Sequence, residues 1–380
     1  MKKFVLVPDS FKGTLSSAEI CGIMQEEIAA VFPDADIRAI PVADGGEGSV
    51  DAFLTAIGGE KKFVTVKGPY GESMEAFYGR LSDTLAVVEM AAAAGLPLAG
   101  ENRHAEKTTT YGVGQLIEAA ARDGAKKIIV GLGGSATNDG GAGMAQALGF
   151  RLLDDRGAAL PYGGAALQQL ARIDAAARDP RLTETEILVA CDVTNPLIGP
   201  NGAAAVYGPQ KGASPEMVVQ LDQALTHFAA VVARDRGVAI AALPGAGAAG
   251  GLGGGLVAFL GARLQRGVEM VIEAVRLKEK MAGAALVITG EGRIDGQSAQ
   301  GKTPVGVAAA AKELGLPVLA VAGGIGPEVE AVFAAGIDGV TAITDHPMTL
   351  AEAVAAAPRL VAAATERMIR IYRCGSRFPL

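Results

Sequence analysis

The sequence predicts an α/β protein in which one domain is interrupted by the insertion of a second. Apolar runs alternate with helical patterns at both ends of the chain, which is typical of the α/β class. The middle has a different texture, with short apolar runs joined by glycine-rich segments, and 380 residues exceed the length of one typical domain. We therefore place a discontinuous α/β domain at residues 1–62 and 284–380, and an inserted glycine-rich α/β domain at residues 63–283.

The N-terminal elements alternate between strand and helix. Residues 4–7 are a continuous apolar run, as in a buried strand of a parallel sheet. Residues 16–19, Ser-Ser-Ala-Glu, have the capping-box pattern, and apolar residues at helical spacing continue from there to Pro33. Residues 37–42 predict the next strand and residues 49–57 the next helix.

The same alternation returns at the C-terminus, and we expect its strands to join the N-terminal ones in one sheet. The predicted strands are residues 285–289, 318–322 and 339–343. The predicted helices are residues 305–314, 328–335 and a long alanine-rich segment from about 350 to 371. In the middle, short strands are predicted at residues 85–89, 128–130 and 187–190.

Composition excludes several classes of function. The 34 basic and 41 acidic residues give a net charge of −7, and the chain has no Trp, so neither charge nor stacking platforms favour a nucleic-acid partner. The longest apolar run, residues 246–260, is broken by glycine and falls short of a membrane span of roughly 20 residues. Cys21, Cys191 and Cys374 are far apart and odd in number, which fits a reducing compartment. We expect a cytoplasmic protein with a small-molecule substrate and no membrane partner.

Glycine is the unusual component of the chain. Its 52 residues are about 14% of the sequence, roughly twice the usual share. They cluster at residues 45–48, 131–143, 245–255 and 290–301, and three of these clusters follow predicted strands. For residues 245–255 the pattern leaves open whether the glycines serve close helix packing or ligand contact.

Two N-terminal loops carry charged side chains after predicted strands. Residues 9–13, Asp-Ser-Phe-Lys-Gly, bring a carboxylate, a hydroxyl and an ammonium group together. Residues 44–48, Asp-Gly-Gly-Glu-Gly, place two carboxylates where a helix begins, and such oxygens are suitable ligands for Mg²⁺. Both segments also have the composition of ordinary turns.

The loop at residues 131–144 is the richest in glycine and follows the apolar run 128–130. Its backbone N–H groups could surround phosphate oxygens as a nest. Gly131, Gly133 and Ala136 also match the dinucleotide fingerprint, and acidic residues follow about 20 positions later. Because we predict no helix starting at Ala136, where a dinucleotide pyrophosphate would need one, this match is the weaker interpretation. It leaves an NAD-dependent dehydrogenase as an alternative.

The segment from Thr289 to Pro304 is predicted as a long polar loop. Residues 296–303 formally match the P-loop pattern. We interpret the match as coincidental because residues 290–295 separate it from the predicted strand and Pro304 follows Thr303. Thr303 as N-cap with Pro304 at the first helical position predicts a helix start suited to anions, beside Lys302.

Asp192 follows another short strand and could orient Mg²⁺ or accept a hydroxyl proton, although an N-cap or Asx-turn would equally explain it. The three histidines lie outside all these loops, which disfavours zinc chemistry and a Ser-His pair. Glycine-rich loops with Asp, Glu, Lys and Arg suit phosphoryl transfer better than hydride transfer.

These motifs together resemble the bacterial type I glycerate kinases. The resemblance runs in order along nearly the whole chain and is carried by residues 8–13, 43–48, 131–144, 190–197, 208–212 and 289–304. It implies ATP- and Mg²⁺-dependent phosphorylation of D-glycerate, giving 2-phosphoglycerate and ADP, with 3-phosphoglycerate as an open alternative. It also implies a flavodoxin-like domain with an inserted second α/β domain. Ser49, where the family more often has Thr, and the tail from Cys374 depart from the family pattern.

On this basis we assign candidate roles, and the sequence does not say which carboxylate serves which role. Oligomeric state is left open, with a homodimer as one alternative. A non-catalytic sensor of a sugar acid or nucleotide is also left open. The candidates for ATP phosphates are Gly133, Gly134, Ser135 and Asn138; those for anionic oxygens of the substrate are Ser10, Lys12, Arg293 and Lys302; those for metal binding are Asp44, Glu47 and Asp192; those for catalysis are Asp44, Asp192, Lys12, Glu291 and Asp295.

Overall fold

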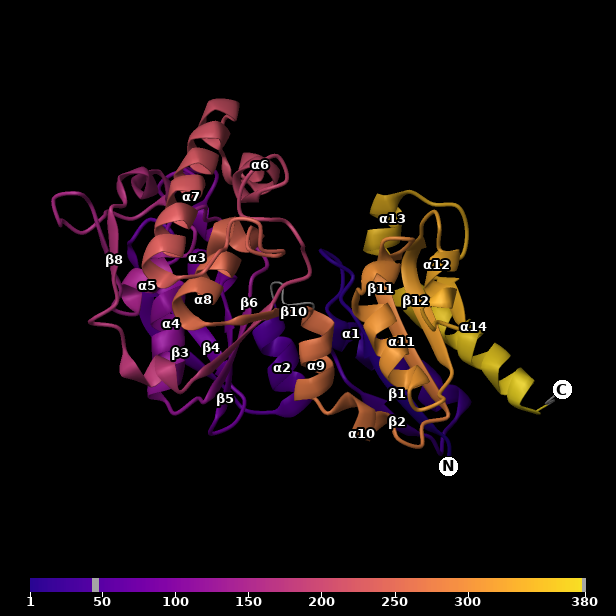
Figure 1. Cartoon of the computed structure of the whole chain (residues 1–380). Helices are drawn as coiled ribbons and strands as arrows, with labels where there is room; N and C mark the ends of the chain where they lie inside the picture. The colour runs from indigo at the N-terminus through magenta and orange to yellow at the C-terminus, as the bar shows by residue number, and fades with distance from the viewer. Residues whose placement is uncertain (43–47, 378–380) are drawn as a thin grey trace. The chain divides into compact units, whose positions relative to one another are not determined.

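The computed structural model describes residues 1–42 and 48–377. The chain divides into two compact units (Figure 1). Unit 1 comprises Met1–Asp44, Thr55–Ile57 and Val268–Leu380, and unit 2 comprises Gly45–Leu54 and Gly58–Gly267. The domain limits drawn from the sequence, after residues 62 and 283, stay a prediction.

Unit 1 contains a five-stranded sheet in the order β13-β12-β11-β1-β2, and each neighbouring pair is parallel. The strands are β1 Lys3–Pro8, β2 Asp36–Ala39, β11 Leu286–Ile294, β12 Val318–Ile325 and β13 Gly339–Ala342. When the five strands are numbered 1 to 5 along the chain and the sheet is followed from β2 to β13, the order is 2-1-3-4-5. This is the flavodoxin order. The predicted fold class and the joining of both chain ends in one sheet are therefore confirmed.

Helices cover the sheet of unit 1. They are α1 Ser17–Val31, α10 Leu277–Met281, α11 Thr303–Lys312, α12 Glu330–Ala334, α13 Leu350–Ala355 and α14 Ala357–Arg377. The buried side chains of α1 and α14 form one core with Phe4 and Leu6 of β1. The predicted capping box is present, because Ser16 accepts the N–H of Glu19 and the Glu19 carboxylate accepts the N–H of Ser16.

Two elements of unit 1 differ from the sequence prediction. β11 does not end at Thr289 but continues to Ile294, because β12 also continues and pairs with it as far as Ile325. The single helix predicted from about residue 350 is two helices, α13 and α14. They separate at Ala356, two residues before Pro358, whose ring lacks an N–H and clashes with the carbonyl four residues earlier.

Unit 2 contains a six-stranded sheet in the order β10-β9-β6-β5-β4-β3 and a small β7-β8 pair. The strands β5, β6, β9 and β10 are parallel neighbours, whereas β3 and β4 form an antiparallel hairpin that the sequence analysis did not predict. The bounds are β3 Glu60–Lys67, β4 Ser73–Arg80, β5 Leu85–Glu89, β6 Lys127–Gly131, β7 Arg151–Leu153, β8 Arg172–Asp174, β9 Glu186–Ala190 and β10 Arg263–Gln265.

The helices of unit 2 enclose a second core. The helices are α3 Ala91–Ala94, α4 Tyr111–Arg122, α5 Ala142–Ala147, α6 Ala203–Tyr207, α7 Pro215–Arg236 and α8 Leu252–Leu260; α2 Ser49–Ile57 and α9 Gly267–Ala274 run across the limits of the two units. Phe259 of α8 packs in this core between Phe150 and Phe228, with ring centroids 5.0 and 6.2 Å away. No helix in the described part of the chain is long and apolar enough to cross a membrane.

Candidate functional site

In unit 2, the parallel strands end level with one another. The sheet register aligns Glu89 of β5 with Gly131 of β6, and Gly131 in turn with Ala190 of β9. Ligands of parallel sheets bind beyond the carboxyl ends of the strands, and the glycine-rich loop after β6 begins at this edge. The candidate phosphate-binding residues therefore lie where a ligand of this sheet is expected.

The first turn of the glycine-rich loop exposes backbone donors. The N–H groups of Gly133 and Gly134 donate to no other residue in the described ranges 1–42 and 48–377. Gly134 has φ +73°, a conformation that favours glycine, and its carbonyl accepts the N–H of Leu96 at 2.7 Å. Two adjacent N–H groups without protein acceptors are suited to binding an anion.

The position of α5 weakens the dinucleotide interpretation of this loop. The fingerprint needs a helix N-terminus close to its third small residue, here Ala136. The helix α5 begins only at Ala142, after the buried residues 137–141. The arrangement expected of a dinucleotide-binding loop is therefore not present.

Asp139 organises the loop from inside, and the sequence analysis did not select it. Its side chain is fully buried and accepts the N–H groups of Gly141 and Gly143, at the start of α5, at 3.1 Å. It also accepts the N–H and the hydroxyl of Thr110, which precedes α4, at 2.8 and 2.9 Å. Burial raises the pKa of Asp139, and these hydrogen bonds oppose the rise. The residue thereby joins the beginnings of two helices.

Lys211 is a second buried charge that the sequence analysis named only as part of a segment. Its ammonium group donates to the carbonyl of Thr137 at 2.6 Å and lies 3.4 Å from the hydroxyl of Ser135. Burial lowers its pKa to about 7, against the opposing effect of Asp139. Lys211 therefore fixes the backbone between two of the candidate phosphate-binding residues, Ser135 and Asn138.

Asn138 is fully buried, and neither its amide nitrogen nor its amide oxygen has a hydrogen-bond partner among the described residues. Buried polar groups are normally paired, and an unpaired amide is costly. The amide of Asn138 therefore has donor and acceptor capacity available for a ligand at this strand edge.

The glycines of residues 245–255 pack against this loop. A Cβ on Gly250 would lie 1.7 Å from the carbonyl oxygen of Thr137, and a Cβ on Gly255 would lie 2.4 Å from that of Gly140. The N–H of Gly140 donates to the carbonyl of Gly250 at 3.0 Å. Of the two alternatives that the sequence left open, the structure shows close packing, here of backbone against backbone.

Two carboxylates lie near the same strand edge of unit 2. Glu89, which the sequence analysis missed, accepts the N–H groups of Gly48 and Val50 at 2.5 and 3.3 Å and so holds the start of α2. Asp192 follows β9, and its Oδ1 accepts the N–H of Gly267 at 2.9 Å. This contact joins residues 75 positions apart, so it is neither the local N-cap nor the Asx-turn that the sequence offered as the alternative to metal binding.

The proposed metal ligands Asp44 and Glu47 lie outside the described residues. Within residues 1–42 and 48–377, no three His, Cys, Asp or Glu side chains come together in a way that could hold a metal ion. The assignment of Asp44 and Glu47 to Mg²⁺ therefore stays a prediction.

In unit 1, the segment after β1, which begins at Asp9, meets the start of α11 at Thr303. Asp9 is buried, its Oδ1 accepts the N–H of Ser10 at 2.7 Å, and its Oδ2 accepts the hydroxyl of Thr303 at 2.8 Å. The N–H of Asp9 donates to the carbonyl of Gly290 at 2.8 Å. Residues nearly 300 positions apart in sequence are thus brought together, with Ser10 beside them.

Four of the charged side chains that the sequence analysis named as candidates in unit 1 form two ion pairs. Lys302 Nζ lies 2.9 Å from Glu291 Oε1, and Arg293 Nε lies 3.1 Å from Asp295 Oδ2. Burial raises the pKa of Glu291, and the charges of Lys302 and the exposed Lys12 oppose the rise. Lys12, Glu291 and Lys302 therefore share one electrostatic environment.

The start of α11 corrects two details of the prediction. Lys302, not Thr303, is the N-cap, and Thr303 is the first helical residue because its hydroxyl is engaged by Asp9. The predicted separation of the P-loop match from its strand is also wrong, because residues 290–294 belong to β11 and the matching segment follows almost directly. That segment nevertheless contains a 3-10 turn at Ser298–Gln300, and Lys302 is paired with Glu291.

The sequence model of the glycerate kinase family matches residues 4–373. The chain belongs to the glycerate kinase family. The resemblance stated from the motifs is confirmed, as is the prediction of a kinase, and the dehydrogenase alternative gains no support.

Relatives of this glycerate kinase family member cover nearly its whole length. It is 50% identical to a glycerate kinase of Halalkalibacterium halodurans, over 93% of this chain and 94% of the relative. It is 48% identical to the glycerate 2-kinase of Escherichia coli, over 92% and 93%. A crystal structure described as a glycerate kinase 2 from Salmonella typhimurium matches with a TM-score of 0.89 at 46% identity, covering 99% of this chain and all of that one.

Proposed function

We propose that this protein transfers the γ-phosphoryl group of ATP to the 2-hydroxyl of D-glycerate, giving 2-phosphoglycerate and ADP. The observation that carries this proposal is the family match over residues 4–373, together with 48% identity to a protein named glycerate 2-kinase. The free cysteines and the lack of a membrane-crossing helix among the described residues support a cytoplasmic location, which we also propose.

In the proposed reaction, the glycerate hydroxyl oxygen bonds to the γ-phosphorus while the bond from that phosphorus to the β,γ-bridging oxygen breaks, and ADP leaves. Such a reaction depends mainly on positioning and charge stabilisation. We assign the N–H groups of Gly133 and Gly134, with Ser135 and the amide of Asn138, to the phosphates of ATP. The open donors and the unpartnered amide support this assignment.

For unit 1 we propose that Ser10, Lys12, Arg293 and Lys302 contact the carboxylate of glycerate or the transferred phosphoryl group. Glu291 is then the group that accepts the hydroxyl proton, with Asp295 holding Arg293 in place. Its raised pKa suits proton transfer, and Lys302 would stabilise the carboxylate before the proton arrives.

The proposed requirement for Mg²⁺ rests on the sequence, with Asp44, Glu47 and Asp192 as its proposed ligands. Bound Mg²⁺ would neutralise charge that develops on the phosphates.

The assay that tests the function measures ADP release with and without D-glycerate and Mg²⁺. We expect ADP release only when glycerate and Mg²⁺ are both present, and ³¹P NMR should place the new phosphate on the 2-oxygen. A phosphate on the 3-oxygen would overturn the regiochemistry, and glycerate-dependent reduction of NAD would overturn the kinase proposal. Ligand binding without turnover would indicate a sensor. Light scattering of the same sample gives the oligomeric state.

Replacing Glu291 by glutamine tests the unit 1 assignment. The amide keeps the size of the side chain but cannot accept the proton, so we expect kcat to fall about 100-fold or more. The matched control is Glu313→Gln, which removes a surface carboxylate paired with Lys278 in the same unit. If steady-state kinetics give Glu291→Gln and Glu313→Gln the same kcat as the unmodified enzyme, Glu291 is not the proton acceptor.

A further inference from the structure

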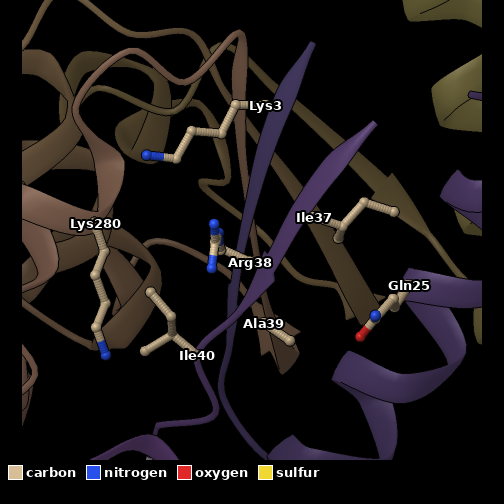
Figure 2. A pocket seen from close by; sticks show the side chains of 7 residues that line it. All are labelled: Lys3, Gln25, Ile37, Arg38, Ala39, Ile40 and Lys280. Atoms are coloured by element: carbon tan, nitrogen blue, oxygen red, sulfur yellow. The ribbon is translucent and has the colours of Figure 1, made fainter. Parts of the chain in front are cut away.

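A hollow in unit 1 lies beside β2, on residues that neither candidate site uses. Its volume is about 500 Å³, and its lining includes Lys3, Gln25, Ile37, Arg38, Ile40 and Lys280 (Figure 2). Lys3, Arg38 and Lys280 lie on one side of β2, while Gln25 and Ile37 lie on the other. The hollow therefore gathers three cationic side chains from three separate segments of the chain.

The charges of two of these side chains are not neutralised by carboxylates in the described part of the protein. Lys3 Nζ donates to the carbonyl of Ala282 at 2.9 Å, and Lys280 Nζ donates to that of Ala56 at 3.2 Å. A carbonyl orients an ammonium group but carries no net charge. Arg38, in contrast, pairs with Asp36 at 2.8 Å. With Lys3, Arg38, Lys280 and Asp36 counted together, the local charge is about +2 at neutral pH.

The backbone of β2 adds donors to the same rim. β2 is an edge strand of the described sheet. The N–H of Asp36 donates to the carbonyl of Lys2, which precedes β1, and the N–H of Ile40 donates to the carbonyl of Leu6 in β1. Because backbone donors alternate in direction along a strand, the N–H groups of Ile37 and Ala39 face the open edge. Ile40 also borders the hollow, but its side chain is buried and exposes little apolar surface to it.

We propose that this hollow binds a small organic phosphate. A phosphate monoester carries close to two negative charges at neutral pH, which matches the uncompensated charge of Lys3 and Lys280. The volume exceeds what an inorganic ion needs and falls among ligand pockets of roughly 300–1,000 Å³. The positive charges of Lys3 and Lys280 attract the phosphate into the hollow, and Arg38 lies between these two side chains (Figure 2).

Calorimetric titration with glycerol 3-phosphate, in the absence of ATP and glycerate, tests the proposal. We expect binding by the unmodified protein and none of glycerol, which has the same carbon chain without the charge. In the double variant Lys3→Gln/Lys280→Gln, loss of two positive charges from the lining should weaken binding about tenfold or more. Glycerate-dependent ADP release should stay unchanged, which shows that the variant is folded.

The matched control is Lys278→Gln/Lys312→Gln, which removes the same charge from the same unit at lysines already paired with Glu313 and Asp338. This variant should bind glycerol 3-phosphate like the unmodified protein. Equal weakening in both double variants would mean that general surface charge attracts the anion, and it would overturn the proposal. Absence of binding by the unmodified protein, or binding unaffected by Lys3→Gln/Lys280→Gln, would overturn it as well. None of these outcomes bears on the proposed kinase activity.

Discussion

Replacing Asp139 by alanine should lower the free energy of unfolding by about 3–5 kcal/mol, because it removes a buried acceptor and leaves its donors unpaired. The N–H groups of Thr110, Gly141 and Gly143 and the hydroxyl of Thr110 would lose their acceptor inside the protein. For a unit of this size the melting temperature should fall by roughly 10 °C in thermal unfolding followed by circular dichroism.

The control for this prediction is Asp179→Ala. Asp179 also accepts a backbone N–H, that of Arg181 at 3.0 Å, but it caps a short turn at the surface. Its loss should cost about 1 kcal/mol. If the two alanine variants melt at the same temperature, the hydrogen bonds of Asp139 contribute no more than an ordinary cap, and the central role given to this residue is wrong.

The second large effect is expected for Gly250→Ala. The new Cβ would lie 1.7 Å from the carbonyl oxygen of Thr137 and 2.7 Å from the Cα of Asn138, so one of the two backbone segments must move. We expect a loss of about 3–5 kcal/mol of stability from overpacking and from the left-handed backbone. Because the displaced segment contains Asn138, the KM for ATP should rise as well, which steady-state kinetics measure.

Gly261→Ala separates the two causes. Gly261 has φ +66°, close to the φ +67° of Gly250, but nothing lies within 4 Å of its added Cβ. This control should show only the conformational cost of about 1–2 kcal/mol and a KM for ATP like that of the unmodified protein. Equal losses in the two variants would show that the contact with Thr137 is unimportant.

Local patterns were enough to predict much of unit 1. The apolar run in β1 and the capping box of α1 both depend on neighbouring residues, and both are present. The extension of β11 through Gly290–Ile294 could not be predicted in this way. Its glycines and charged residues are typical of a loop, and they adopt a strand because β12 supplies hydrogen-bond partners along the same length.

The same limit applies to the site. The cluster of glycines was enough to predict an anion-binding loop at Gly133 and Gly134, because glycine-rich backbone can present its N–H groups to a ligand. The roles of Lys211 and Glu89 could not be foreseen, because their partners are 74 and 41 positions away, and the contact of Asp139 with Thr110 spans 29 positions. A local signal existed only for Asp139, which precedes two glycines and the start of α5 as capping residues often do.

The contact between the loop around Gly140 and the glycines at Gly250 and Gly255 has a consequence for redesign. Since main chain meets main chain there, few side chains are available whose replacement could tune the loop gradually. A library that randomises residues 131–143 alone would change the loop while the backbone of residues 245–255 stays the same. Most variants would then no longer fit against that backbone. The transferable module is the pair of segments, residues 131–143 with 245–255, and recombination experiments that aim to change the phosphate donor should exchange both together.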